Sequence, residues 1–426
     1  MAAARRTASV RMYNVGFGDA FVVTIRDGKE HWRMLVDCGV HAHGRARPLE
    51  DAVHAIIDDL RAESADGVPR LDVVAATHHH ADHIAGFQFD EWAQVEVGEV
   101  WVPFVEDPDD DDARELRKVH TRVAQRLTAL LDDRVRALGV GAGENLTTAL
   151  WFAANSSGNE LATDRLLGRN SLGFATTPVV RYLPSLEPER NCIDLGIAGA
   201  VAHVLGPSRD ADTLKRMHPP STAGWLTLDS DPDFALRDRE RDTPLFDARK
   251  FVLDRSEIDE QYPQLSAEQR ALDGLDVLND DALLGAASVL ERSVNNTSLF
   301  FVLEVGDVRL LFPGDSQHGA WEHVLNDPAT AALVSDVAFL KLSHHGSHNG
   351  TPRRYIEQIL PEGRDAMLPY GEVERWKATI PKDTLLQGLA LRKHRVVRAD
   401  APEAKRGKVT VNGDLWSEIR FRVPTR

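Results

Sequence analysis

A compact motif of potential metal ligands, THHHADH at residues 77–83, limits the folds that are open to this chain. A short apolar run precedes the motif directly, which predicts that a buried strand ends in a loop of ligands. In an extended loop, alternating residues such as His78 and His80 point the same way and can bind one ion. Asp82 and His83 can then turn toward a second ion. The helical H-E-x-x-H spacing of zinc proteases does not occur here, so a helix-borne site of that kind is excluded.

The apolar residues recur with two different periods, which together predict an α/β fold. Apolar runs flank the pairs DG at 27–28 and GD at 306–307, as in tight hairpins. A helix is predicted to begin at Pro48, and residues 337–342 predict another buried strand, which ends at a histidine pair. The apolar positions of the helix recur at helical spacing: Ala52, Val53, Ile56, Ile57 and Leu60.

Two stretches lack a regular core pattern and are predicted to be insertions, at about residues 104–195 and 209–292. The first contains four aspartates at 109–112 before a helical stretch at 113–138. We interpret these aspartates as a solvated helix start, favoured by the helix dipole, in preference to a metal site. We expect both insertions to decorate one domain, residues 8–426, without forming an independent domain.

Four further features lie along residues 10–350, in the same order as in a known family. They are NVGFGDA at 14–20, LVD at 35–37, NTSL at 296–299 with LFPGD at 311–315, and LKLSHHGS at 340–347. With the histidine motif, they resemble the metallo-β-lactamase superfamily, and within it the soluble hydrolase domain of the competence channel ComEC and its stand-alone relatives. The resemblance implies an αββα sandwich in which each half contributes a mixed sheet with helices outside. It places the ligands on loops at one sheet edge and does not cover the two insertions.

The resemblance also implies roles for individual residues. Asp315 would bridge two ions, and one of His344 and His345 would complete the second site. We favour His345 as the ligand because the last ligand of the superfamily commonly precedes a glycine. His344 would then be catalytic and face the substrate or leaving group. Asp82 would both bind metal and orient the nucleophile, and Asp37 would orient a ligand histidine from outside the first shell.

The predicted metal ligands are thus His78, His80, Asp82, His83, Asp315 and His345. Ser347, His348 and Asn296 are expected to line the substrate pocket. Many superfamily members supply one more histidine from a strand in the middle of the chain. His203 stands in the equivalent stretch, where we interpret it as a strand residue, and a ligand role for it stays open.

The predicted activity is hydrolysis by a hydroxide that bridges two divalent ions. Two ions, two carboxylates and a hydroxide leave a net positive site, which lowers the pKa of bound water toward about 7. The resemblance favours a phosphodiesterase or nuclease. One alternative is a hydrolase of a lactone, a thioester or a phosphorylcholine-type small molecule, and another is an inactive binding or regulatory module. Histidine and carboxylate donors without cysteine suit zinc first, with manganese or iron as alternatives.

Composition bears on the partners and the compartment. The net charge of −16 gives no nonspecific attraction to nucleic acid. Residues 341–426, however, hold more Lys and Arg than Asp and Glu, so a phosphodiester or other anionic substrate is expected and nucleic acid stays open. The only cysteines, Cys38 and Cys192, suit a reducing cytoplasm. No apolar run reaches the roughly 20 residues of a membrane helix, so no membrane partner is expected. The sequence leaves the oligomeric state undetermined.

Overall fold

The computed structural model describes residues 6–139, 143–156, 159–197, 199–214, 216–219, 225, 280–374, 376–377 and 379–424. The chain divides into two compact units. Unit 1 comprises Met1–Asp107, Asn159–Leu226 and Asn295–Arg426, and unit 2 comprises Pro108–Gly158 and Thr227–Val294. All predicted site residues belong to unit 1.

Within the described residues, the first sheet of unit 1 has eight strands in the order β14-β15-β1-β2-β3-β4-β5-β6. The pairs from β14 to β3 are antiparallel, and those from β3 to β6 are parallel. The strands are β1 (Thr7–Tyr13), β2 (Ala20–Asp27), β3 (Glu30–Cys38), β4 (Arg70–Ala75), β5 (Glu96–Pro103), β6 (Val179–Leu183), β14 (Val409–Asn412) and β15 (Trp416–Arg422).

The second sheet of unit 1 has seven strands over the described residues, in the order β13-β12-β11-β10-β9-β8-β7. It is also mixed, because β7 to β10 pair antiparallel and β10 to β13 pair parallel. The strands are β7 (Cys192–Asp194), β8 (Ala200–Gly206), β9 (Phe300–Val305), β10 (Val308–Phe312), β11 (Phe339–Lys341), β12 (Asp365–Leu368) and β13 (Arg395–Arg398).

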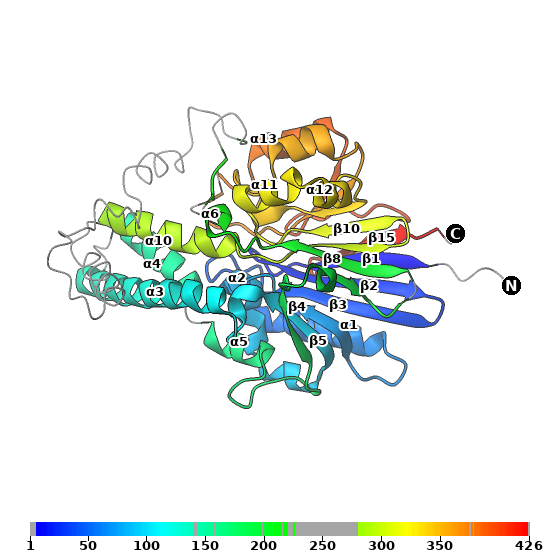
Figure 1. Ribbon diagram of the computed structural model, residues 1–426, viewed down its shortest axis with the longest axis horizontal. Coiled ribbons are helices and arrows are strands. Elements are labelled where there is room, and N and C mark those ends of the chain that lie inside the picture. The colour runs from blue at the N-terminus through cyan, green and yellow to red at the C-terminus, as the bar shows by residue number, and fades with distance from the viewer. Residues whose placement is uncertain are drawn as a thin grey trace. The chain divides into compact units, whose positions relative to one another are not determined.

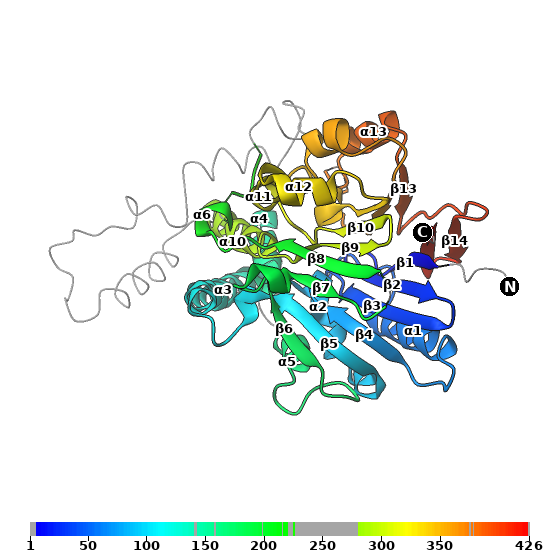
Figure 2. The same ribbon diagram turned by 45° about the vertical axis from the view of Figure 1, so that its right-hand side comes forward.

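The central core of unit 1 contains apolar side chains from both sheets. Phe21 of the first sheet meets Phe312 of the second edge to face, with ring centroids 6.0 Å apart. The helices cover the outer faces (Figures 1 and 2). Ile56 of α1 belongs to the apolar cluster on the first sheet, and Trp321 of α11 and Leu389 of α13 belong to the cluster on the second. The helices of unit 1 are α1 (Leu49–Ala62), α2 (Ala81–Ile84), α5 (Glu160–Leu166), α6 (Ala211–Leu214), α11 (His318–Asn326), α12 (Pro328–Val334) and α13 (Asp383–Leu391).

Unit 2 consists, in its described part, of helices α3 (Asp111–Leu138), α4 (Glu144–Asn155) and most of α10 (Asp280–Asn295), which share an apolar cluster of their own. The carboxylate of Asp110 caps α3 by accepting a hydrogen bond from the backbone nitrogen of Ala113 at 2.9 Å. The aspartate run is therefore a helix start, as predicted. None of the helices in the described part of the chain is both long and apolar enough to span a membrane.

The α/β class is confirmed, with two mixed sheets and helices. Both predicted hairpins are present as β2–β3 and β9–β10, and α1 begins one residue after Pro48. Part of the first expected insertion, including β6, belongs to unit 1 and pairs with β5. Much of the second, residues 226–279, lies outside the described residues. The insertion boundaries and the αββα sandwich of the metallo-β-lactamase superfamily stay predictions.

Candidate metal centre

The candidate ligands lie on loops at the ends of strands. The histidine motif follows β4, Asp315 follows β10 and His345 follows β11. Asp19 lies in the turn between β1 and β2. Parallel strands present their carboxyl ends at a common edge, which is where α/β proteins usually bind ligands. The fold therefore brings together side chains that are as far apart in sequence as Asp82 and His345.

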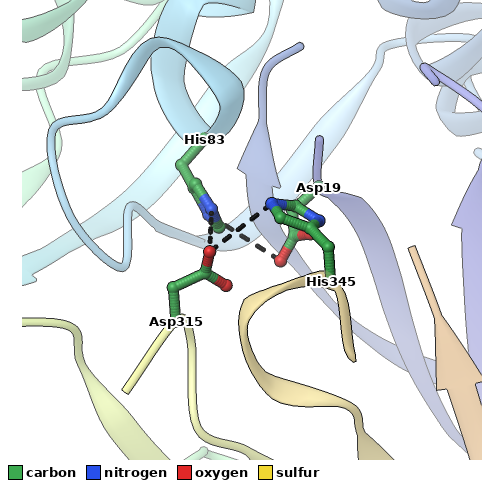
Figure 3. A group of neighbouring side chains, drawn as sticks. All are labelled: Asp19, His83, Asp315 and His345. Atoms are coloured by element: carbon green, nitrogen blue, oxygen red, sulfur yellow. Dashed lines mark ion pairs between the residues drawn. The ribbon is translucent and has the colours of Figure 1, made fainter. Parts of the chain in front are cut away.

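Four buried side chains form the centre of this site (Figure 3). Asp19, His83, Asp315 and His345 each offer a ligand atom, and these atoms all lie within 4.8 Å of one another. Nε2 of His83 is 3.2 Å from Oδ2 of Asp315, and Nε2 of His345 is 3.4 Å from the same oxygen. Nε2 of His345 also lies 3.3 Å from Oδ2 of Asp82. Three of the predicted ligands, His83, Asp315 and His345, thus converge, with Asp82 beside them.

His78 and His80 form a second group next to the first. Nε2 of His78 lies 3.0 Å from Nδ1 of His80, and the ring centroids of His78 and His83 are 4.1 Å apart. Nδ1 of His78 contacts the hydroxyls of Thr77 at 3.1 Å and Ser298 at 3.2 Å. The two hydroxyls therefore hold the ring at Nδ1, and Nε2 faces His80. Sequence reasoning quoted Ser298 as part of a motif but gave it no role.

Hydrogen bonds from outside the centre orient its two main rings. Nδ1 of His83 donates to Asp37 at 2.8 Å, and the same carboxylate accepts from the backbone nitrogen and the hydroxyl of Thr77, both at 2.7 Å. Nδ1 of His345 donates to the carbonyl oxygen of Pro369 at 3.0 Å. Each bond leaves Nε2 as the nitrogen that faces the carboxylates. Metal-binding histidines are commonly oriented in this way, and Asp37 lies where the predicted orienting carboxylate should be.

The backbone of the ligand loop packs directly on two neighbouring turns. A Cβ at Gly39 would lie 2.4 Å from the carbonyl oxygen of Ala81 and 2.5 Å from the nitrogen of His83. The nitrogen of Gly39 donates to the carbonyl of Asp19 at 2.9 Å, and the nitrogen of Asp19 donates to the carbonyl of Asp82 at 2.9 Å. These contacts between three backbone segments therefore fix the positions of Asp19, Asp82 and His83 relative to one another.

The histidine pair after β11 adopts an unusual backbone conformation. His344 and His345 both have φ of 49°, which lies in the left-handed region that residues other than glycine rarely adopt. Such residues cost on the order of 1–3 kcal/mol each and persist where the surroundings impose them. Here the backbone nitrogen of His344 donates to Oδ1 of Asp315 at 3.1 Å. This turn sends the two imidazoles to different environments.

The ring of His344 contacts neutral polar side chains. Its Nδ1 lies 2.8 Å from the hydroxyl of Ser347 and 3.1 Å from Oδ1 of Asn349, and its Nε2 lies 3.3 Å from the amide nitrogen of Asn295. Nε2 of His348 lies 3.5 Å from Nδ1 of His218. Ser347 thus contacts His344, whereas His348 lies beside His218, and both Ser347 and His348 are buried.

Two other residues singled out in the sequence, Asn296 and His203, make contacts that support the fold. The amide of Asn296 donates to the carbonyls of Leu214 at 2.9 Å and Arg216 at 3.2 Å, and its oxygen accepts from the nitrogen of Gln317 at 3.0 Å. The side chain is fully buried and joins loops of the fold, and its predicted role in substrate binding stays a prediction. His203 lies on β8 as a strand residue, with its Nε2 4.0 Å from Oε2 of a glutamate on β9.

Burial and charge set different protonation states for the imidazoles. Burial lowers the pKa of His78 and His80 well below the ordinary value, so both rings are neutral and suited to metal binding. Burial opposes charge on His83 and His345 as well, but the carboxylates, Asp315 first among them, outweigh it and raise the pKa of both rings. The centre therefore attracts positive charge.

Two carboxylates of the centre, Asp82 and Asp315, favour the ionised form despite their burial. Burial alone would raise the pKa of Asp82, but His345 and the other neighbouring imidazoles outweigh it and lower that pKa well below the ordinary value. Burial likewise opposes ionisation of Asp315, and Lys341, followed by the histidines, lowers its pKa. Ionised carboxylates next to imidazoles that are neutral, or that release a proton when an ion binds, are a donor set for divalent cations.

One buried atom indicates that a cation fits this centre. Among the described residues, Nε2 of His83 lies 3.2 Å from Oδ2 of Asp315 but makes no hydrogen bond of good geometry. Nearly all buried polar atoms in native proteins do have one. A divalent ion near Asp315 would replace the proton that the carboxylates favour on His83 and would bind its Nε2, so the residues present fit the metal that the resemblance implies.

The comparison with known proteins gives partial support to the resemblance. ComE operon protein 3 of Bacillus subtilis (strain 168) is 32% identical to this chain over 133 residues. The match covers 31% of this chain and 15% of the length of that protein. No protein-family model matches the chain. The chain therefore has a partial similarity to ComEC-like proteins, and its family stays a proposal.

Sequence reasoning missed two residues of the centre, Asp19 and Lys341. Nζ of Lys341 lies 2.6 Å from Oδ2 of Asp19 and 2.7 Å from Oδ1 of Asp315. The lysine interrupts an apolar run that we predicted to be a buried strand. A charge inside such a strand requires a buried partner, and this signal could have found the lysine. No local pattern identifies Asp19 as its partner.

Proposed function

We propose that this chain is a metal-dependent hydrolase of the metallo-β-lactamase fold that binds two divalent ions and cleaves phosphodiesters. One observation carries the proposal: the buried convergence of His83, Asp315 and His345, with Asp82 alongside, at the loops that follow β4, β10 and β11. Among the described residues, Nε2 of His83 faces Oδ2 of Asp315 at 3.2 Å without making a hydrogen bond of good geometry, so a cation could bind both atoms.

The contacts support an assignment of ligands to the two ions. His78 and His80 would hold the first ion, since their facing nitrogens are 3.0 Å apart. Asp82, His83 and His345 would hold the second. Asp315 would serve both ions, a role supported by the position of its Oδ2 near two of the ligand rings. The donor set suits zinc first, then manganese or iron.

When bound, the two ions would lower the pKa of a water molecule and stabilise charge on the attacking and leaving oxygens. The side chains of the protein would position the reaction. Asp82 would orient the nucleophile. His344, held on its Nδ1 side by Ser347 and Asn349, would give a proton to the leaving oxygen, and help of this kind is worth about 10²- to 10⁴-fold in rate. Ser347 and His348 would border the substrate.

The substrate class follows from the chemistry and the partial similarity. An anionic phosphodiester, nucleic acid among the candidates, suits the net positive charge that two bound divalent ions would give the centre, and it suits a basic segment at residues 341–426. A lactone, thioester or phosphorylcholine-type substrate is the second candidate, and the net charge of −16 favours it. We propose a cytoplasmic location because the sequence has only two cysteines.

The test combines metal analysis with two substrate panels. Protein purified without chelator should contain close to two ions per chain and should cleave bis-p-nitrophenyl phosphate and DNA faster than a set of lactones. Asp315→Ala should abolish turnover and leave the fold intact. Asp365→Asn is the matched control, because Asp365 is also buried and ion-paired, to Arg395 at 2.9 Å and Lys408 at 2.7 Å, outside the ligand group. No bound metal after loading would refute the proposal, and turnover of lactones alone would favour the second candidate.

A further inference from the structure

Lys341 places a buried ammonium inside the candidate metal centre. The residue is 1% exposed. Its Nζ lies 2.6 Å from Oδ2 of Asp19, 2.7 Å from Oδ1 of Asp315 and 2.9 Å from the carbonyl oxygen of Gly314. An ammonium has three hydrogens to donate, and these three contacts account for all of them. The lysine is therefore a fixed positive charge within the site.

Because of the lysine, the two carboxylate oxygens of Asp315 have different partners. Oδ1 accepts from Nζ of Lys341 and, at 3.1 Å, from the backbone nitrogen of His344. Oδ2 is left to face Nε2 of His83 at 3.2 Å and Nε2 of His345 at 3.4 Å. One oxygen is thus tied to the protein, and the other points to the place where cations would bind.

Asp19 lies among the candidate ligands, but its position favours a different role. Its nearest charged atom is Nζ of Lys341. It approaches the rings of His83 and His345 from their Nδ1 sides, at 3.7 Å in each case. Those nitrogens already donate to Asp37 and to Pro369. Asp315 lies on the Nε2 side of both rings, where the metal would bind. Asp19 lies on the other side of the rings, near their Nδ1 atoms.

We propose that Lys341 is a positioning residue that holds Asp315 through one oxygen, and that Asp19 is the counter-ion of this lysine and not a metal ligand. This inference rests on the proposed function for its metal-binding part. Because the pair is neutral, it orients Asp315 without changing the net charge of the centre. A buried charge that loses its partner is strongly destabilising, which explains why both members are present.

The proposal predicts opposite effects for the two single variants on metal affinity. Lys341→Met removes a positive charge and frees two carboxylates, and this stronger attraction outweighs the lost orientation of Asp315, so Zn²⁺ should bind about tenfold or more tightly. Asp19→Asn leaves Lys341 with Asp315 as its only carboxylate, so Zn²⁺ should bind about tenfold or more weakly, with the number of ions at saturation unchanged. The double variant should return to within about threefold of the wild type, because neither charge is left unpaired. Lys341→Arg is the charge-preserving control, and its affinity should stay near that of the wild type.

The measurement is competition between each full-length variant and a chelator of known Zn²⁺ affinity, with the ions counted at saturation. Loss of one ion in Asp19→Asn that the double variant does not regain would make Asp19 a ligand and overturn the proposal. Weaker binding by Lys341→Met would overturn it as well. Thermal unfolding of the metal-free proteins tests the pair independently, since each single variant should unfold at a lower temperature and the double variant should recover relative to Lys341→Met. If the wild type binds no ion, the proposed function fails, and this coupling in unfolding still decides the pairing of Asp19 with Lys341. A double variant no more stable than Lys341→Met would refute that pairing.

Discussion

Gly39→Ala should disable the metal centre without altering any ligand. The new Cβ would lie 2.4 Å from the carbonyl oxygen of Ala81, 2.5 Å from the carbonyl carbon of Asp82 and 2.5 Å from the nitrogen of His83. All three are backbone atoms, which cannot rotate aside as a flexible side chain could. Ordinary contact for a Cβ begins at 3.4 Å, so the loop that contains Ala81, Asp82 and His83 must move away from Gly39. We estimate a displacement of about 1 Å in a close-packed interior.

The magnitude follows from this displacement. Overpacking a buried site typically costs about 1–3 kcal/mol, and we expect the upper part of that range because the obstacle is backbone. A misplacement of about 1 Å at a reacting centre can lower the rate about 10²-fold. Gly39→Ala should therefore retain the fold, lose metal affinity and turn over substrate about 10²-fold more slowly.

The assay compares elemental metal content, unfolding free energy and turnover with those of Gly173→Ala. A Cβ at Gly173 would have no atom within 4 Å, so this control adds the same methyl group without a clash. Wild-type metal affinity and turnover in Gly39→Ala would refute the argument that this backbone contact positions Asp82 and His83. An equal loss in Gly173→Ala would show that the effect is not local.

Three more predictions concern single side chains. His345→Ala should lose metal from one site, whereas His344→Ala should retain metal and lose rate; metal counts and rates measured side by side decide this, and the reverse pattern would exchange the two roles. Asp37→Asn should weaken metal binding about 10- to 100-fold, because the hydrogen bond that orients His83 loses its charge; unchanged affinity in a chelator competition would contradict this role. Burial holds the pKa of His41 at about 4, against an ordinary 6.5, so the unfolded chain binds the proton more readily and stability should fall as the pH drops from about 6.5 to about 4, by about 3 kcal/mol from this group. His41→Phe should be less sensitive to acid in urea unfolding over that window, and an unchanged pH dependence would show that His41 does not titrate in this way.

Elements encoded by short-range patterns could be predicted from the sequence. The period of α1 and the turn pairs of both hairpins depend on residues a few positions apart, and each appears in the structure. The same holds for the ligand loop after β4, since the apolar run and the motif are contiguous in the sequence. His78, His80, Asp82 and His83 were therefore recognisable as candidate ligands without knowledge of the fold.

Which residues distant in sequence become contact partners was decided by the tertiary structure. Asp19 and Lys341 each lie within a recognisable motif, but only the facing of the two sheet edges brings them to 2.6 Å. Asn296 shows the opposite case, because it stands in a motif and yet uses its amide to join loops of the fold. Local sequence sets backbone propensity and the supply of donor atoms. Which donors share a desolvated site is decided by the order of the strands and the burial that the fold imposes, since a charge that loses its water on burial needs a partner in the same site.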